Sequence, residues 1–423
     1  MISWQQKLDK ILLFLIFLCL AAAPLYVIRF HFVLSPLAEF SYPTTLLELF
    51  LFLLFLVWVI RKIFSLVWLG EPLVEEWSAL SVLILILLGL ASVSAVISPV
   101  LRSSLGIFKA YFLEPVLFYF LLRDLRKIET LPKWIVSGLF LSGFWLAILG
   151  IGQGLFGVLA VTPHELPRAH GVYNSANALA LYLGPLIILI AAFLSNHDRA
   201  GENFFLYRKS VLRILLLVLL AAFGLTCSLG GIVGLLAASL FLLLSTRNFQ
   251  KAKRFLLFSV PLLFVFTIFF VFFIVPQITP EKNIPVARVS DSTVVIRLCL
   301  WEGTRDMLLQ RTSLGAGLSG FKHVYRDFRT CDNELLEYPH NIFLNFWSEI
   351  GLLGVLVFLF FCGLWVFRID GEDVSGRGKR IIASAFLAQF VYFLVHGLVD
   401  VPYFKNDLAL QFWTLVAFSV NWF

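Results

Sequence analysis

Long apolar runs, separated by short polar connections, extend from one end of the chain to the other. A helix needs about 20 mostly apolar residues to cross a bilayer. Runs of this kind predict about twelve transmembrane helices, at residues 11–30, 44–64, 78–98, 104–122, 132–156, 173–195, 211–227, 231–246, 254–275, 341–367, 381–399 and 404–421. The two short runs between 211 and 246 could instead form one bent helix with a re-entrant section. We therefore expect an all-α integral membrane protein.

The longest polar connection, residues 276–339, divides the chain into three parts. Residues 1–275 would hold the first nine helices, and residues 340–423 the last three. Lysine and arginine cluster after the even-numbered runs and are sparse in the opposite connections. Because basic loops stay in the cytoplasm, both termini are predicted to be cytoplasmic. The long connection is then one extracytoplasmic loop containing short helices, and we expect it to bind substrate and carry out catalysis.

The first apolar run superficially resembles a secretory signal peptide, with Lys7 and Lys10 before it. The apolar character continues through Pro24 to Phe30, which is long enough to span a bilayer. We expect a retained first helix in a multi-pass protein of the cytoplasmic (inner) membrane.

Composition excludes a soluble enzyme. The 423 residues are 60% hydrophobic and only 14% charged, against about 25% in soluble proteins. The net charge of +7 would suggest nucleic acid only if the basic residues gathered on one soluble face. They lie between apolar runs instead, so the expected partner is the lipid bilayer and not nucleic acid.

Two of the five cysteines, Cys299 and Cys331, share the long loop. They could form a disulfide if the loop lies outside the cytoplasm. Sequence does not give the distance between them, and we expect two unpaired thiols.

Residues 292–311 of the loop have the pattern of an amphipathic helix. Arg297, Trp301 and Arg305 recur every four residues and share one stripe. Two guanidinium groups beside an aromatic ring suit a phosphate-bearing ligand with an apolar tail. The alternative is a surface helix in which Glu302 and Asp306 pair with the arginines.

A second outer connection reads "HELPRAHGVYNSANALALYLG". Asn174 and Asn177 can cap the helix that follows. A helix N-terminus also attracts phosphate, so Arg168 beside it could hold the same anion as Arg297.

The motif "GAGLSG" at 315–320 matches a dinucleotide-binding pattern, but it follows a helix pattern instead of a strand. We expect the glycines to form a tight turn that returns the loop to the membrane. The sequence has no metal-ligand spacing and no phosphate-binding P-loop. We expect no cofactor and no metal.

Polar residues interrupt the apolar run in "YPHNIFLNFWSEIGLLG", residues 338–354. If the helix begins near Pro339, then Asn341, Asn345 and Glu349 form a polar stripe that faces the protein interior or a water-filled cleft, because polar groups facing lipid are costly. His340 would lie at the positive end of this helix, which keeps the ring neutral and suits a general base. The alternative is an interfacial histidine without a role.

Further charged residues lie within or beside the apolar runs. Lys109 and Glu114 are five residues apart, so they do not share a helix face and each should meet another helix. Asp400, Lys405 and Asp407 flank the last outer turn, as a local ion cluster or as part of the outer cleft.

Three segments together resemble the O-antigen ligase and polymerase superfamily. "HNIFLNFWSEIGLLG" is similar to the His-Asn…Glu-x-Gly…Gly signature of that family, and "RLCLWEGTRDML…SLGAGLSGF" to its Arg, Trp and Gly-x-Gly pattern. "RAHGVYNSANALALYL" resembles its Arg-x-x-Gly…Asn-x-x-Asn segment. With about twelve spans and one long outer loop, the resemblance covers nearly the whole chain.

The resemblance implies a metal-independent glycosyltransferase. Such enzymes transfer a glycan from a polyprenyl-pyrophosphate carrier to a hydroxyl group on the outer face of the membrane. His340 would deprotonate the acceptor, and Arg297 would hold the departing pyrophosphate. Arg168, Arg305, Trp301, Asn341 and Glu349 would contact pyrophosphate or glycan. The acceptor could be a lipid, a growing polysaccharide or a protein.

One position departs from the family. An arginine is usual where this chain has Leu229, between Ser228 and Gly230. Arg168 or Arg305 could supply the charge, the phosphate could be held less tightly, or the activity could be altered. Two other classes remain open: an exporter of lipid-linked sugars, with Lys109, Glu114 and Asp400 along its pathway, and a non-catalytic membrane scaffold.

Overall fold

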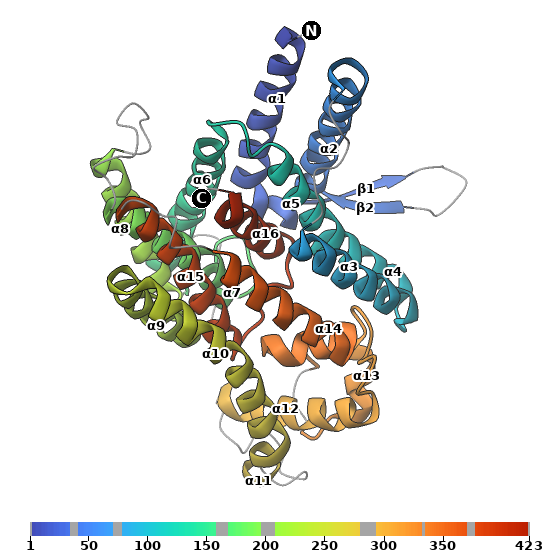
Figure 1. The fold of residues 1–423 in the computed structure, drawn as a ribbon. Coiled ribbons are helices and arrows are strands. Elements are labelled where there is room, and N and C mark those ends of the chain that lie inside the picture. The colour runs from blue at the N-terminus through green and yellow to red at the C-terminus, as the bar shows by residue number, and fades with distance from the viewer. Residues whose placement is uncertain are drawn as a thin grey trace.

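The computed structural model describes residues 2–33, 41–70, 78–157, 168–195, 208–279, 293–331, 335–369 and 377–421, and most of them are helical. The long α-helices are α1 (Ile2–Ala21), α2 (Leu46–Phe64), α3 (Ala79–Ile97), α5 (Glu114–Asp124), α6 (Leu131–Phe156), α7 (Ala176–Ser195), α8 (Lys209–Leu225), α9 (Leu229–Arg247), α10 (Phe249–Phe269), α12 (Thr293–Gln310), α14 (Ile342–Arg368), α15 (Arg377–Gly397) and α16 (Asn406–Asn421). The shorter elements are η1 (Ala23–Val27), η2 (Ser65–Leu69), α4 (Leu101–Ile107), η3 (Phe108–Leu113), η5 (Phe270–Ile274), α11 (Val275–Ile278), α13 (Phe321–Tyr325) and η7 (Arg326–Phe328), with strands β1 (Arg29–Val33) and β2 (Ser41–Thr45). Figure 1 shows their arrangement.

Nine helices of the described residues are long and apolar enough to cross a membrane. Each of the runs predicted from sequence overlaps a long helical segment, and α1, α8 and α16 are the three that are not among the nine. The protein is therefore a multi-pass, predominantly helical membrane protein. Residues 276–339 contain the long helix α12 and the short helix α13.

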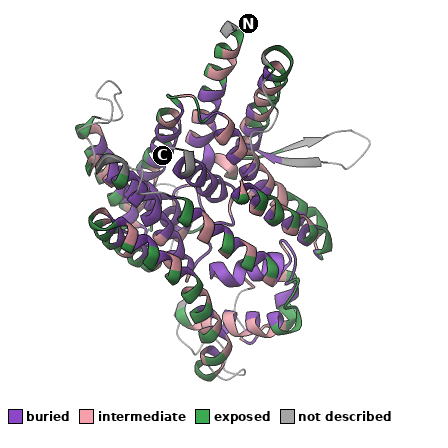
Figure 2. Ribbon diagram, viewed as in Figure 1, coloured by how far each residue is buried: buried purple, intermediate pink, exposed green. Residues whose placement is uncertain are grey.

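Burial separates central helices from peripheral ones (Figure 2). The apolar window is 83% buried in α7 and in α15, but only 22% buried in α2 and in the segment of α10. Large apolar side chains such as Phe52 and Phe258 are 69% and 77% exposed. Lipid can cover such side chains without cost, so the peripheral helices have the surface of a bilayer-facing shell.

The first helix ends earlier than predicted. It stops at Ala21, and Pro24 lies in the short η1 that follows. Proline lacks the N–H that a continuing helix needs, so the prediction of helix through Phe30 is wrong. The chain then forms the antiparallel hairpin β1–β2, in which Arg29 lies opposite Thr45. This hairpin departs from the all-α expectation.

The two short runs between 211 and 246 are two helices and not one bent helix. A turn at Thr226–Ser228 separates α8 from α9, and Cys227 in this turn has a φ of 49°. The Ser228 side chain accepts a hydrogen bond from the Gly231 N–H, which caps α9.

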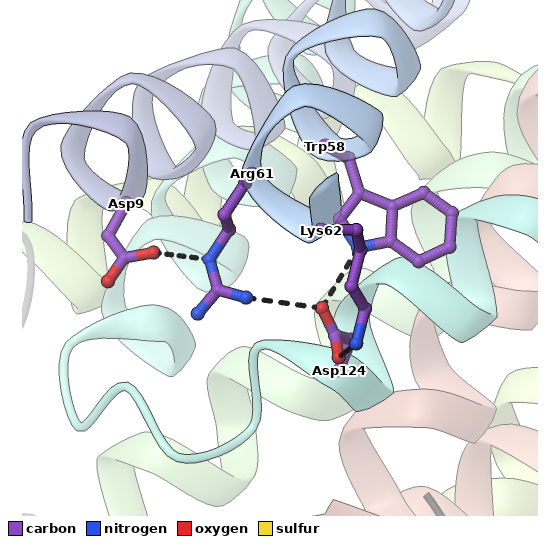
Figure 3. Close-up of polar contacts among 5 residues, drawn as sticks. All are labelled: Asp9, Trp58, Arg61, Lys62 and Asp124. Atoms are coloured by element: carbon purple, nitrogen blue, oxygen red, sulfur yellow. Dashed lines mark hydrogen bonds and ion pairs between the residues drawn. The ribbon is translucent and has the colours of Figure 1, made fainter. Parts of the chain in front are cut away.

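An ion network connects α1, α2 and α5 (Figure 3). Arg61 Nε donates to Asp9 Oδ1 at 2.6 Å, and its Nη1 lies 3.4 Å from Asp124 Oδ2. Asp124 also accepts from the Trp58 indole at 2.9 Å and pairs with Lys62. The basic pair at the end of the second predicted span is thus neutralised by carboxylates of two other helices, which joins the three helices.

Candidate active site at the start of α14

Asn341 sets where α14 begins. Its Oδ1 accepts hydrogen bonds from the N–H groups of Phe343 and Leu344, at 3.0 and 3.1 Å, as an N-cap residue does. Its Nδ2 donates to the Leu398 carbonyl at 2.9 Å. The helix therefore starts at Ile342, after His340 instead of before it, and its first turn is tied to the connection between α15 and α16.

His340 lies just outside the helix in a constrained backbone conformation. Its φ of 49° is in the left-handed region, where a residue with a side chain is held at a cost. Nδ1 lies 3.4 Å from Asp400 Oδ1, and the Tyr338 ring packs edge-on at 4.8 Å between centroids. The side chain is 23% exposed, and its buried nitrogen is Nδ1. The ring therefore presents its other edge outward.

Asp400 faces His340 from the connection between α15 and α16, with only 4% of the residue exposed. Burial alone would raise the pKa of this carboxyl. The neighbouring His340 and His396, with the Val401 N–H, lower that pKa to about 2 instead. Asp400 is therefore an ionised carboxylate that can orient the imidazole and stabilise positive charge on it.

Arg297 lies on α12 within electrostatic range of this pair. Burial lowers the pKa of its guanidinium, and the Asp400 carboxylate opposes that change. Arginine stays protonated at any working pH, so the site contains a fixed cation beside the His340–Asp400 pair.

The other two residues of the predicted stripe, Trp301 and Arg305, lie apart along α12 and make different contacts. The Trp301 indole donates to the Pro339 carbonyl at 2.8 Å, next to His340, and its ring packs edge-on against Phe270. Arg305 lies two turns beyond Arg297, about 12 Å along the helix. It pairs there with Asp306 at 3.6 Å. The predicted helix is confirmed over Thr293–Gln310, and Trp301 holds the segment that carries His340 through the hydrogen bond to Pro339.

A disulfide anchors α12 to the segment that leads to the site. Cys299 and Cys331 are bonded, with Cα atoms 5.8 Å apart. The expectation of two unpaired thiols is therefore wrong. The bond joins residues 32 apart in sequence, so no helical periodicity could have revealed it.

Arg168 binds the turn between α8 and α9. Its Nε donates to the Thr226 carbonyl at 2.8 Å, and one Nη donates to the Cys227 carbonyl at 3.2 Å. Leu229, where the resemblance leads us to expect an arginine, is the first residue of α9 directly after this turn and is 79% exposed. Arg168 thus places a guanidinium at the turn that precedes Leu229.

The same turn lies against the segment that carries Asp400. A Cβ added to Gly230 would come 2.7 Å from Val399 Cγ2 and 3.0 Å from His396 Cδ2. The start of α9 therefore lies next to residues 396–400. Arg168, Arg297 and His340 come from distant parts of the sequence and reach the same end of the helix bundle.

Glu349 has a defined partner deeper in α14. Its Oε2 accepts the Ser319 N–H at 2.7 Å, and Ser319 belongs to the glycine-rich turn. The turn also docks on a kink at Gly351, whose φ of 74° interrupts the helix. Because the kink breaks the helical ladder, the Ser348 carbonyl accepts instead from the Ala316 N–H, at 2.7 Å. The predicted tight turn is present, and it is held by the polar groups of α14.

Asn345 contributes the remaining polar group of the predicted stripe. Its side chain is 1% exposed, and neither its Oδ1 nor its Nδ2 has a hydrogen-bond partner among the described atoms. The three side chains of the stripe thus differ in their contacts. Asn341 caps the helix, Asn345 is buried between them, and Glu349 holds the glycine-rich turn.

The partner of His340 was not assigned from the sequence. The sequence suggests for Asp400 only an ion cluster or a part of the predicted outer cleft. The available signal is an acidic residue in the connection between the last two predicted helices. Sixty residues separate it from His340, and only the packing of α14 against α15 and α16 brings the two together.

Comparison with known proteins finds a family model that matches part of the chain. Residues 214–359 match the family model of the O-antigen ligase domain, a segment that runs from α8 into α14 and includes His340 and Glu349. The chain is thus a multi-pass membrane protein with an O-antigen ligase-family segment, and the resemblance seen in the sequence is confirmed there.

Three curated relatives are each named "Putative polysaccharide ligase". The one from Rickettsia typhi is 23% identical over 155 residues, which cover 34% of this chain and 36% of the relative. The one from Rickettsia prowazekii is 24% identical over 155 residues, with the same coverage. The one from Rickettsia conorii is 26% identical over 138 residues, which cover 30% of this chain and 31% of the relative. The chain thus matches about a third of the length of these relatives.

Proposed function

We propose that the protein is a metal-independent glycosyltransferase of the cytoplasmic membrane. It would transfer a glycan from a polyprenyl-pyrophosphate carrier to an acceptor hydroxyl on the extracytoplasmic face. The observation that carries this proposal is the His340–Asp400 pair, with Arg297 within electrostatic range of its carboxylate. The family match over residues 214–359 supports the same reaction class.

The chemistry assigns one role to each of these side chains. The outward nitrogen of His340, Nε2, takes the proton of the acceptor hydroxyl as its oxygen attacks the anomeric carbon of the donor sugar. The bond from that carbon to the pyrophosphate oxygen breaks, and the pyrophosphate leaves with its lipid. Asp400 stabilises the imidazolium that forms, as a positioning residue. Arg297 supplies the fixed positive charge that the leaving pyrophosphate needs.

Arg168 is our candidate for the charge that is missing at Leu229. Its guanidinium lies at the same turn and donates to two carbonyl oxygens there, which fixes its position. A pyrophosphate carries more than one negative charge, so a second fixed cation would share its stabilisation with Arg297. Trp301, Asn341 and Glu349 would act by holding the segment around His340 in place.

Two features support an active site on the extracytoplasmic face of the membrane. Disulfides persist in oxidising compartments, and Cys299–Cys331 lies on the loop that carries Arg297. The basic pair Arg61–Lys62 lies in the network between helix ends, where the positive-inside rule expects cytoplasm. With both termini cytoplasmic, the start of α14 faces outward.

The acceptor is left open by this proposal. Ligation to a lipid core, polymerisation of a polysaccharide and transfer to a protein all use the same base and the same leaving group. A set of purified acceptors separates them.

The test is glycan transfer by the purified protein, reconstituted in lipid with a polyprenyl-pyrophosphate glycan. We expect His340→Ala and Arg297→Ala each to lower the rate by at least about a hundredfold, because each removes a group that acts on the reacting atoms. Arg311→Ala is the matched control, since Arg311 is an exposed arginine just past the end of α12. It should transfer at the rate of the unmodified protein.

Transfer that survives both substitutions would reject this assignment. A loss of transfer together with failed membrane insertion, or with a changed elution profile, would instead indicate misfolding. His340→Gln keeps the size and polarity of the side chain but lacks its basicity. It separates these outcomes, because it should insert normally and still fail to transfer.

A further inference from the structure

His396 is another histidine close to the candidate active site. It lies in the last turn of α15, four residues before Asp400, and only 1% of it is exposed. Asp400 and Arg297 are both within electrostatic range of its ring. The proposed function gives His396 no role, although the ring lies among the side chains that would carry out the chemistry.

The hydrogen bonds of Tyr392 locate the proton of the His396 ring. The Tyr392 hydroxyl donates to the Ala180 carbonyl at 2.6 Å, because a carbonyl oxygen can only accept. His396 Nδ1 lies 3.0 Å from the same hydroxyl oxygen. The single hydroxyl proton is already donated, so Nδ1 must be the donor in this second bond. A neutral imidazole carries one proton, and Nε2 is therefore left as a hydrogen-bond acceptor.

Two glycines hold Tyr392 in the place that this network requires. A Cβ added to Gly184 of α7 would collide with the Tyr392 ring, and one added to Gly234 of α9 would come 3.2 Å from Tyr392 Cδ2. Helix α15 packs against both α7 and α9. The Tyr392 ring is thus held against the backbone of two helices, and its hydroxyl is fixed before any ligand binds.

The Nε2 edge of the His396 ring faces the start of α9. A Cβ added to Gly230 would lie 3.0 Å from His396 Cδ2 and 3.4 Å from Nε2, so glycine at this position leaves the nitrogen uncovered. Within the part of the chain that the structure describes, Nε2 makes no hydrogen bond, and it is not one of the fully enclosed nitrogens without a partner. An acceptor without a partner thus lies beside the turn that Arg168 binds.

A nitrogen lone pair selects the kind of group that it can bind. The oxygens of an ionised pyrophosphate are acceptors, so they would bind Arg297 and not Nε2. The groups of a glycosyl pyrophosphate that can donate a hydrogen bond are the hydroxyl and amide N–H groups of its sugar. The group on C2, the ring carbon next to the anomeric carbon, is closest to the pyrophosphate. It is therefore the group that can meet Nε2 while Arg297 holds the phosphates.

We propose that His396 binds the glycan donor, with Nε2 accepting a hydrogen bond from the hydroxyl or acetamido N–H on C2 of its first sugar. This rests on the proposed function, because it takes the pyrophosphate of a glycan donor as the ligand of Arg297. His396 is then a determinant of specificity. A sugar that cannot donate a hydrogen bond from C2 leaves Nε2 without a partner and binds more weakly.

Binding is measured on the full-length protein in nanodiscs of uncharged lipid, separately from transfer. The probes are polyprenyl pyrophosphate without a sugar, and the same lipid with a single glucose, N-acetylglucosamine or 2-deoxy-2-fluoroglucose. Fluorine keeps the position small and polar but cannot donate a hydrogen bond. Glucose or N-acetylglucosamine should bind about tenfold more tightly than the fluoro sugar, the size of one hydrogen bond. The tighter of the two identifies the group on C2.

Two substitutions of His396 separate the roles of its nitrogens. His396→Asn keeps an N–H near Nδ1, and with it the bond to Tyr392, but has no acceptor at the position of Nε2. Its preference over the fluoro sugar should fall to within about twofold. His396→Gln places an amide oxygen near the position of Nε2 and should retain most of the preference. His323→Gln is the matched control, because His323 is an exposed histidine of α13. It should bind every probe as the unmodified protein does.

The probe without a sugar tests whether His396 binds phosphate instead. A neutral acceptor does not attract pyrophosphate, so His396→Asn should bind this probe as tightly as the unmodified protein does. A loss as large as that seen with the sugar-bearing probes would make His396 a phosphate ligand and overturn the proposal. A more selective asparagine variant than glutamine variant would also overturn it, because Nδ1 would then be the nitrogen that matters.

The comparison of probes on the unmodified protein needs no substitution, so it decides the matter even where a variant misfolds. Equal binding of the fluoro sugar and both natural sugars by a protein that transfers glycan rejects the role of His396 and leaves the reaction standing. A preference that depends on His396, in a protein that transfers no glycan, leaves the binding role standing and rejects the proposed reaction.

Discussion

The pairing with Asp400 distinguishes His340 from an interfacial histidine without a role. Asp400 is almost fully buried, and the pKa of its carboxyl is lowered to about 2 although burial opposes ionisation. The basic groups around it therefore outweigh its desolvation. A carboxylate held ionised in this way contributes to stability as well as to chemistry.

This contribution predicts a defined dependence on pH. A group whose pKa is lower in the folded state stabilises the fold above its unfolded pKa, and the stabilisation is lost as the pH falls through the folded pKa. For Asp400 the change from 3.8 to about 2 corresponds to about 2 kcal/mol. Asp400→Asn should therefore lower the Tm in detergent at neutral pH, and the difference from the unmodified protein should shrink between about pH 4 and pH 2.

Asp327→Asn serves as the control for this measurement, because Asp327 is an exposed carboxylate between α13 and α14. It should leave the Tm nearly unchanged at every pH. A Tm difference for Asp400→Asn that stays constant across the acid range would show that the carboxylate charge is not what stabilises the fold.

At the scale of elements, the kink in α14 joins the glycine-rich turn to the helix that follows the site. Gly351 has a φ of 74°, and a Cβ there would collide with the Ser313 carbonyl. The kink exposes the backbone groups with which the turn bonds, and Glu349 holds the turn from one side. One glycine thus decides both the bend of α14 and the docking of residues 312–319.

Gly351→Ala should therefore destabilise the protein by about 1–3 kcal/mol, the cost of a side chain forced into the left-handed region. The measurement is Tm in detergent, together with limited proteolysis of the outer loop. Gly363→Ala in the same helix is the matched control, because its Cβ would meet nothing within 4 Å. It should be neutral or slightly stabilising. Equal effects of the two substitutions would mean that the kink is not under strain.

The sequence could predict elements whose signal is local. Apolar runs of about 20 residues located the long helices, and a four-residue spacing located α12. The hairpin β1–β2 was missed because β1 follows the first apolar run without a change in hydrophobic character. The helix ends before Pro24, and the hairpin follows it. His340, Arg297 and Arg168 were predicted site residues, but the Asp400 pairing and the disulfide depend on long-range packing.

For the whole molecule, the proposed reaction requires that the end bearing His340 faces away from the cytoplasm. The turn between α8 and α9 lies at this end, since Gly230 packs against His396 and Val399. Cys227 in that turn is exposed. All five cysteines are among the described residues: Cys19 and Cys362 are buried, and Cys299 and Cys331 are bonded to each other. The chain thus carries a single exposed free thiol, at the end of the bundle whose orientation matters.

A membrane-impermeant maleimide should therefore label Cys227 in right-side-out vesicles without permeabilisation, and Cys227→Ser should abolish the labelling. Glu129→Cys, introduced into the Cys227→Ser variant, tests the opposite side of the membrane. Glu129 is exposed and follows α5, whose last residue Asp124 belongs to the Arg61 network. That thiol should react only after permeabilisation or in inside-out vesicles. The reversed pattern would put His340 on the cytoplasmic face, where a reducing environment disfavours the Cys299–Cys331 bond and the proposed direction of transfer fails.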